Sequence, residues 1–205
     1  MKKILAMLLA LVMVLSLAAC ASTQPAAEPA ASSDAPAESG KTYTVGVCQL
    51  VQHEALDAAT QGFVDALKEA LGDAVTIDVQ NASGDSVNCG TIVNGFVSKG
   101  VDLIMANATP ALTAAVSATA DIPILGTSIT AYGVALDIDD FSGTVGGNVS
   151  GTSDLADLQK QAQMILDWFP ETKTVGLLFC SAEPNSRYQI DEVRKALEAQ
   201  GVTCE

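Results

Sequence analysis

The chain has 205 residues, and 24 acidic against 10 Lys and Arg residues give it a formal net charge of -14. Such an excess of negative charge repels phosphate backbones and anionic headgroups, so the composition argues against binding of nucleic acids. The five cysteines form no Cys-x-x-Cys pair and His53 is the single histidine. We therefore expect no metal site and no cofactor.

The N-terminus has the pattern of an export signal. Lys2 and Lys3 precede an uncharged apolar run over residues 4–19, which is shorter than the roughly 20 residues that a membrane-spanning helix requires. The run ends in Leu-Ala-Ala-Cys20, which resembles the lipobox of bacterial lipoproteins, where the cysteine is acylated and becomes the first residue. We expect a signal peptide over 1–19 and a lipid on Cys20 that anchors the protein outside the cell membrane. A secretory signal followed by a chance cysteine is the alternative.

A tether is expected between the lipid and the first strand. Residues 20–41 contain mainly Ala, Pro, Ser and Glu and almost no large apolar side chain. Such a segment cannot bury enough surface to offset the loss of chain entropy, so we expect it to be disordered.

From residue 43 onward, short apolar runs alternate with amphipathic segments. The runs predict strands over 43–50, 75–79, 101–106 and 122–125, and the segments between them predict helices over 56–70, 92–97 and 110–119. Strands that are apolar almost throughout are typical of a parallel sheet covered on both faces. The predicted fold class is α/β, with a doubly wound parallel-sheet lobe over residues 42–135.

The next stretch, residues 136–153, is rich in Gly, Asp, Ser and Thr, and is interpreted as a hinge or crossover that includes Gly143, Gly146, Gly147 and Gly151. A helix over 154–168, a strand over 174–180 and a helix over 185–200 then predict a second α/β lobe, at 154–205. One clear strand leaves a wide unpaired edge, so we expect this second lobe to be incomplete.

Four cysteines remain once Cys20 carries the lipid. Cys48 and Cys180 fall inside apolar strand-like runs, so they are expected to be free, buried thiols. The sequence does not determine whether any pair forms a disulfide.

Candidate ligand contacts follow the predicted strands, because ligands of open parallel sheets bind beyond the carboxyl ends of the strands. The side chains there are mostly neutral hydrogen-bonding groups, which suit binding better than catalysis. Thr109 before Pro110 is typical of a helix cap with outward-facing N–H groups, where a carboxylate can bind. His53 is expected to be a helix cap or a surface residue, with lining of the pocket as the alternative. No Ser or Cys nucleophile elbow, second histidine or carboxylate cluster accompanies it, so the sequence does not indicate an enzyme.

Nine short stretches between residue 43 and the end carry a family resemblance. They are Gly46–Gln49 with His53, 55–58, 62–63, 79–82, 101–104, 108–111, 121–124, 147–151 and 183–186. In this order they resemble the tryptophan/tyrosine-type substrate-binding proteins of ABC transporters, which have the type I periplasmic-binding-protein fold. The resemblance implies two lobes, joined by a hinge, that close on a small molecule, commonly an aromatic amino acid.

The same resemblance implies a set of ligand-binding residues. They are Gln49, Thr109, Pro110, Ala111, Thr127, Ser128, Glu183, Asn185 and Ser186. One departure affects the ligand: the family usually has an Asp-Pro step after the fourth strand, whereas residues 128–133 here read Ser-Ile-Thr-Ala-Tyr-Gly. The identity of the ligand therefore stays open.

The predicted function is an extracytoplasmic solute-binding lipoprotein that delivers a small molecule to the permease subunits of an ABC importer. The expected ligand is an amino acid, of the aromatic class that the resemblance implies. A lipoprotein sensor of the same fold, coupled to a membrane receptor, is the alternative from a different class. A hydrolase is a third hypothesis, and measurable turnover would be needed to support it.

Overall fold

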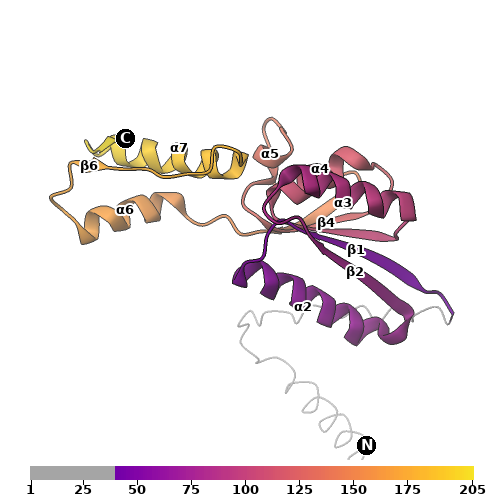
Figure 1. Ribbon diagram of the computed structural model, residues 1–205. Helices are drawn as coiled ribbons and strands as arrows, with labels where there is room; N and C mark the ends of the chain where they lie inside the picture. The colour runs from indigo at the N-terminus through magenta and orange to yellow at the C-terminus, as the bar shows by residue number, and fades with distance from the viewer. Residues whose placement is uncertain (1–39) are drawn as a thin grey trace, which may run out of the picture. The chain divides into compact units, whose positions relative to one another are not determined.

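The computed structural model describes residues 40–205, which contain two parallel β-sheets (Figure 1). The predicted α/β class is confirmed. The expected signal peptide, Cys20 and nearly all of the expected tether lie outside the described residues. Among residues 40–205, no helix combines the length and the apolar character that crossing a bilayer requires.

The first sheet has five parallel strands in the order β2-β1-β3-β4-β5. Its strands are β1 (Tyr43–Gln49), β2 (Val75–Asn81), β3 (Leu103–Asn107), β4 (Ile124–Ile129) and β5 (Val149–Ser153). The connecting helices are α2 (Glu54–Leu71), the 3-10 turn η1 (Gly72–Ala74), α3 (Ser86–Lys99), α4 (Thr109–Ala118) and α5 (Tyr132–Ala135). The first four strands and their three long helices follow the order that the sequence predicts.

Helices cover both faces of this sheet. On one face, Phe63 and Leu67 of α2 pack against Val45, Val47 and Met105. On the other face, α3 and α4 contribute to a larger core with the remaining side chains of β1, β3 and β4. Figure 1 shows α2 on one side of the strands and the two other helices opposite. The sheet therefore separates two apolar layers, as expected for a doubly wound lobe.

The stretch expected to be a hinge or crossover contains strand β5, for which the sequence gives only a weak signal. Strand β5 pairs in parallel with β4, and its Gly151 lies so close to β4 that an added Cβ would overlap the carbonyl oxygen of Gly126. Gly151 is thus required for close strand packing. Its strand was missed because Val149–Ser153 is polar and mostly exposed, so it lacks the apolar pattern that marks a strand.

The second sheet is small and is described by itself. Strands β6 (Thr174–Val175) and β7 (Thr203–Cys204) pair in parallel, next to helices α6 (Leu158–Trp168) and α7 (Pro184–Glu198). Its core consists of Ala162, Ala196, Leu197 and Val202, with a few half-buried neighbours. The helix predicted over 154–168 is α6, and it begins at Leu158 instead of 154. Asp157 caps this helix, because its side chain accepts a hydrogen bond from the Lys160 N–H.

The strand expected over 174–180 is regular only over its first two residues. Past them, the Leu177 N–H still donates to the Glu205 carbonyl at 2.8 Å, but Leu178 is 96% exposed. The segment is covered on one side only, which also explains why Cys180 is exposed and not buried as expected. Cys48 is buried as predicted, and the four cysteines of the described part are free.

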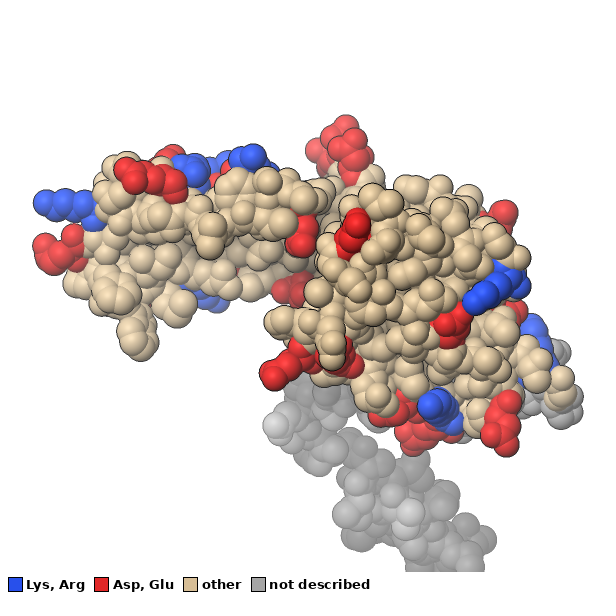
Figure 2. All heavy atoms as spheres, in the orientation of Figure 1, with Lys and Arg blue, Asp and Glu red and all other residues tan. Residues whose placement is uncertain are grey.

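Charged groups are spread over the surface. On the face shown in Figure 2, Lys and Arg side chains lie at scattered positions among neutral and acidic ones and form no large cationic patch. An anionic ligand group on this face would therefore depend on local dipoles more than on a basic surface.

Candidate functional site

Four polar side chains form one row across the carboxyl edge of the first sheet. The strand register pairs Asn81 with Gln49, Gln49 with Asn107, and Asn107 with Thr127. Partners in register point to the same face of a sheet, so the row lies on the face covered by α2. Polar groups thus replace the apolar side chains of the preceding rows at the edge where ligands of this fold class bind.

A buried hydrogen-bond network holds the centre of this row. Thr60 Oγ1 donates to Gln49 Oε1 at 2.6 Å and accepts from Asn107 Nδ2 at 3.0 Å. Gln49 Nε2 donates to Asp57 Oδ1 and to the backbone carbonyl of Val51. Gln49 is only 4% exposed and both of its N–H donors are engaged within the fold. The structure therefore places Gln49 in the wall of the site, where it orients Asp57.

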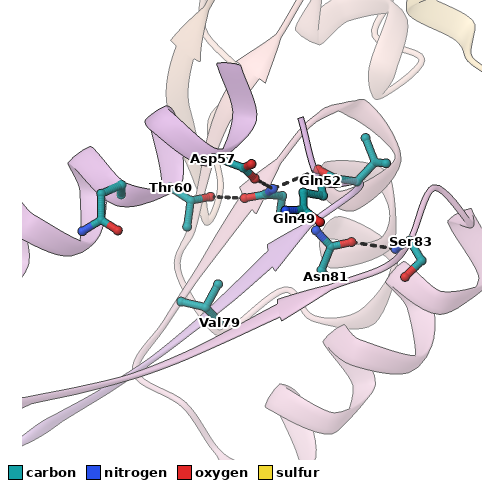
Figure 3. A pocket seen from close by; sticks show the side chains of 9 residues that line it. Gln49, Gln52, Asp57, Thr60, Val79, Asn81 and Ser83 are labelled. Carbon is teal, nitrogen blue, oxygen red and sulfur yellow. Dashed lines mark hydrogen bonds between the residues drawn. The ribbon is translucent and has the colours of Figure 1, made fainter. Parts of the chain in front are cut away.

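A groove lies between α2 and the β2 edge of the sheet (Figure 3). Its volume is about 660 Å³, within the range of small-molecule sites. It is lined by Gln49, Val51, Gln52, Asp57, Thr60, Gln61, Val79, Asn81 and Ser83. The turn after β2 is fixed because Asn81 Oδ1 accepts from the Ser83 N–H at 2.8 Å. The lining offers neutral donors and acceptors with one carboxylate, which suits a small polar molecule.

Helix α4 begins beside the row, and the structure corrects its expected cap. Ala108, at φ +88°, is the cap residue, whereas Thr109 and Pro110 are the first two helical residues. The Ala108 N–H donates to the Thr127 carbonyl at 3.0 Å, and the Ala108 carbonyl accepts from the Leu112 N–H at 3.1 Å. The sheet ladder thus extends one residue past β3, and this shifts the start of the helix.

The opening of α4 leaves polar groups without partners. Thr109 is 2% exposed and its Oγ1 has no hydrogen-bond partner in the described part of the chain; the same holds for Oδ1 of the fully buried Asn107. No acceptor among residues 40–205 meets the N–H of Thr109 or of Ala111. Buried polar atoms are rarely left unpaired, and helix N-terminal N–H groups attract anions. These groups therefore form a candidate subsite for a ligand carboxylate.

The end of β4 carries the next two expected contacts. The β4–β5 register shifts between Gly126 and Ile129, and Ser128 within this bulge has φ +56°. Thr127 lines a second cavity of about 300 Å³ that it shares with Phe63 and Ser150, also on the α2 face. Thr127 thus lies in the polar row but faces a different hollow from the groove beside β2.

The unusual loop after β4 is anchored by Tyr132. Its hydroxyl donates to the Gly126 carbonyl at 3.0 Å and lies 3.2 Å from the Thr152 carbonyl. Burial, with a smaller contribution from Asp154, raises the pKa of the Tyr132 phenol to about 12. Tyr132, which lies in the stretch that departs from the family's usual pattern, therefore links β4 to β5.

In the second lobe, the expected contacts lie at the start of α7. Glu183 is the cap residue and makes no side-chain cap bond, and Pro184 is at the first helical position, one residue before the predicted start. Ser186 Oγ accepts from the Cys180 N–H at 2.9 Å, so this hydroxyl supports the loop before the helix. Asn185 Oδ1 is buried and has no partner within the described residues. Asn185 therefore retains a buried acceptor that no residue in the described part of the chain satisfies.

His53 caps α2, which is one of the roles that the sequence predicts for it. Its Nδ1 accepts from the Ala55 N–H at 3.2 Å. Sequence reasoning missed Asp57 and Thr60 as site residues, because both lie within an amphipathic helix where polar residues normally face solvent. Their spacing of three residues places them on one helix face, and this was the available signal.

Comparison with known proteins identifies the family. Residues 44–205 match the family described as ABC transporter substrate binding protein. A tyrosine-binding protein of Clostridioides difficile is 36% identical over 94% of this chain and 56% of its own length. The chain thus spans about half the length of this relative.

Two solved structures resemble the chain closely. The first is an ABC domain from Streptococcus pneumoniae in complex with L-Trp, at 36% identity and a TM-score of 0.74. The second is a conserved domain protein from Vibrio cholerae, at 31% identity and a TM-score of 0.74. Each comparison covers 80% of this chain and 56% of the other chain. The resemblance drawn from the sequence is confirmed, and the chain belongs to the family of ABC transporter substrate-binding proteins.

Proposed function

We propose that this protein is the extracytoplasmic solute-binding component of an ABC importer and that its ligand is an aromatic amino acid, bound without turnover. Family membership supports the transport role, and the relatives that bind tyrosine and carry L-Trp support the ligand class. The observation that carries the proposal is the opening of α4, where Thr109 Oγ1 and Asn107 Oδ1 are buried and unpaired among residues 40–205.

The ligand carboxylate is assigned to the start of α4. The N–H groups of Thr109 and Ala111, with the Thr109 hydroxyl, offer three donors at the positive end of a 10-residue helix. Asn107 Oδ1 and the Asp57 carboxylate supply acceptors for an ammonium group. A set that combines neutral donors with acceptors suits a zwitterion.

The remaining expected residues have supporting roles in this proposal. Gln49, Pro110, Thr127 and Ser128 shape the wall of the first-lobe subsite. Glu183, Asn185 and Ser186 are proposed to contact the ligand from the second lobe, so that closure of the lobes is favoured by contacts made only in the closed state.

The decisive experiment compares an amino acid with its amide. Calorimetry with tyrosine, tryptophan and phenylalanine is expected to show binding, and the matching carboxamides should lose most of the affinity, because they remove the negative charge at the start of α4. Leucine serves as a control for the aromatic ring. Equal binding of an acid and its amide would contradict a carboxylate at this position.

Lipid anchoring through Cys20 and contact with permease subunits complete the proposal. Cys20→Ser is expected to move the protein from the membrane fraction to the soluble fraction or to leave it unprocessed, since the hydroxyl cannot take the thioether-linked lipid. Cys180→Ser is the matched control, because Cys180 is exposed and free. A Cys20→Ser protein that is still acylated and membrane-bound would overturn the anchor.

A further inference from the structure

Two cysteines share the core beneath the site. Cys48 on β1 and Cys89 in the first turn of α3 are both 0% exposed and belong to the same core cluster. Neither takes part in the proposed ligand contacts. Cys48 directly precedes Gln49, and Cys89 directly follows Asn88, whose Nδ2 donates to the Ala82 carbonyl in the loop after β2.

The packing of α3 on β1 brings the two thiols together. Gly46 and Cys48 are two residues apart and point to the same face of β1. Cys89 and Phe96 are seven residues apart and lie on one face of α3. A Cβ on Gly46 would lie 2.5 Å from ring atoms of Phe96, so the helix approaches the strand closely at this point. About two helical turns nearer the carboxyl edge, the same packing of α3 on β1 sets Cys89 against Cys48.

The thiols interact with each other as a donor and an acceptor. A hydrogen bond from the Cys48 thiol is the main cause that lowers the pKa of Cys89, and the same bond, with burial, raises the pKa of Cys48. Cys89 is therefore the thiol that ionises first and the better nucleophile of the pair. Asp85, nearby at the start of α3, opposes this ionisation.

We propose that Cys48 and Cys89 form a disulfide in the exported protein and that it joins β1 to α3 directly beneath the candidate site. The oxidant is a small or protein disulfide. The Cys89 thiolate first exchanges with this disulfide and releases one of its thiols. Cys48, after losing its proton, then attacks the Cys89 sulfur, forms the Cys48–Cys89 bond and expels the second thiol. Both thiol protons and two electrons pass to the oxidant, which is reduced to two thiols.

This crosslink would enclose α2, β2 and the loop after β2, which together carry most of the groove lining. It would hold the end of β1 against the start of α3 and keep Gln49 and the loop at Ala82 in register. A crosslink that closes a long loop restricts the unfolded chain, so the folded state gains stability. The inference rests on the proposed export of the protein and is independent of which ligand binds.

The test is a thiol assay on the full-length exported protein. The protein is isolated without reductant, denatured, alkylated and digested, and the masses of its peptides are measured by mass spectrometry. The expected result is one crosslinked pair of peptides carrying Cys48 and Cys89, two hydrogen atoms lighter than the sum of the separate peptides, while the peptides of Cys180 and Cys204 are alkylated. Reductant should also lower the Tm by roughly 5 to 20 °C.

Two variants give matched controls. Cys180→Ala/Cys204→Ala is expected to keep the crosslinked pair and the effect of reductant on the Tm, whereas Cys48→Ala/Cys89→Ala should lose both. If the second variant does not fold, the peptide masses of the unaltered protein still show whether Cys48 and Cys89 form a disulfide. Alkylation of both Cys48 and Cys89 in protein isolated without reductant, or a crosslink between other cysteines, would overturn the proposal.

Discussion

Single polar atoms distinguish the residues that hold the fold from those that are available to a ligand. Thr60 Oγ1 bridges Gln49 and Asn107, and each of these bonds is buried. Thr109 Oγ1, at the start of α4, is also buried but has no partner in the described part of the chain. We therefore expect the two threonines to have opposite roles, Thr60 in the fold and Thr109 in ligand binding.

A pair of matched substitutions tests this difference. Thr109→Val should reduce ligand affinity by about 0.5–1.5 kcal/mol through one lost hydrogen bond, with little change in the urea midpoint, because the hydroxyl has no bond within the fold. Thr60→Val should instead lower the free energy of unfolding by about 1–3 kcal/mol, since Gln49 Oε1 and Asn107 Nδ2 each lose a buried partner. Calorimetry and urea unfolding measure the two effects. A Thr109→Val protein with unchanged affinity would remove Thr109 from the binding site.

At the scale of elements, Tyr132 joins α5 to both β4 and β5. The glycines Gly126 and Gly151 make room for its hydroxyl, because a Cβ on either would overlap it. The neutral phenol donates to a strand carbonyl in a buried position, so its ionised form would lose this bond and remain desolvated. The hydrogen bond from Tyr132 to the Gly126 carbonyl is therefore expected to be lost at high pH.

Alkaline unfolding provides the test of this hydrogen bond. The pKa of Tyr132 is about 12 in the folded chain, against about 10 for an unfolded tyrosine, so the folded state holds the proton more tightly. The resulting stabilisation, about 2–3 kcal/mol, is fully present below pH of about 10 and is lost as the pH rises toward about 12. Tyr132→Phe should be less stable at neutral pH and should lose less stability over this interval. Parallel stability curves for the two proteins between these pH values would contradict the assignment.

At the scale of the whole molecule, the two sheets differ in the size of the cores that they support. Sixteen buried residues form the main cluster of the first lobe, with a second cluster under α2. The second sheet is supported by four buried residues, and Trp168 and Phe169 next to it are largely exposed. Since burial of apolar surface provides most of the driving force for folding, the first lobe is expected to be the more stable part of this chain.

Hydrogen exchange of the 205-residue chain tests this ranking. Amides of β1, β3 and β4 should exchange much more slowly than those of α6 and α7, because local opening of the smaller core exposes less apolar surface. Mass spectrometry of peptides from each part measures the rates. Equally strong protection of both parts would show that the second core is stabilised by contacts beyond its four buried residues.

The sequence by itself determined the α/β class, the order of the first four strands and their helices, and the carboxyl edge as the place to look for a site. These follow from apolar periodicity and capping residues, which act over a few neighbours in the chain. It also determined the family through short stretches in a fixed order.

Only the tertiary structure decided features that depend on what lies opposite a residue. Strand β5 is polar and is defined by its pairing with β4, and Gln49 is engaged because Asp57 and Thr60 lie across from it. The register of β3 and β4 moved the cap of α4 to Ala108. Cys48 and Cys89 are 41 positions apart in sequence and meet only because α3 packs on β1, a contact between distant segments that local patterns cannot specify.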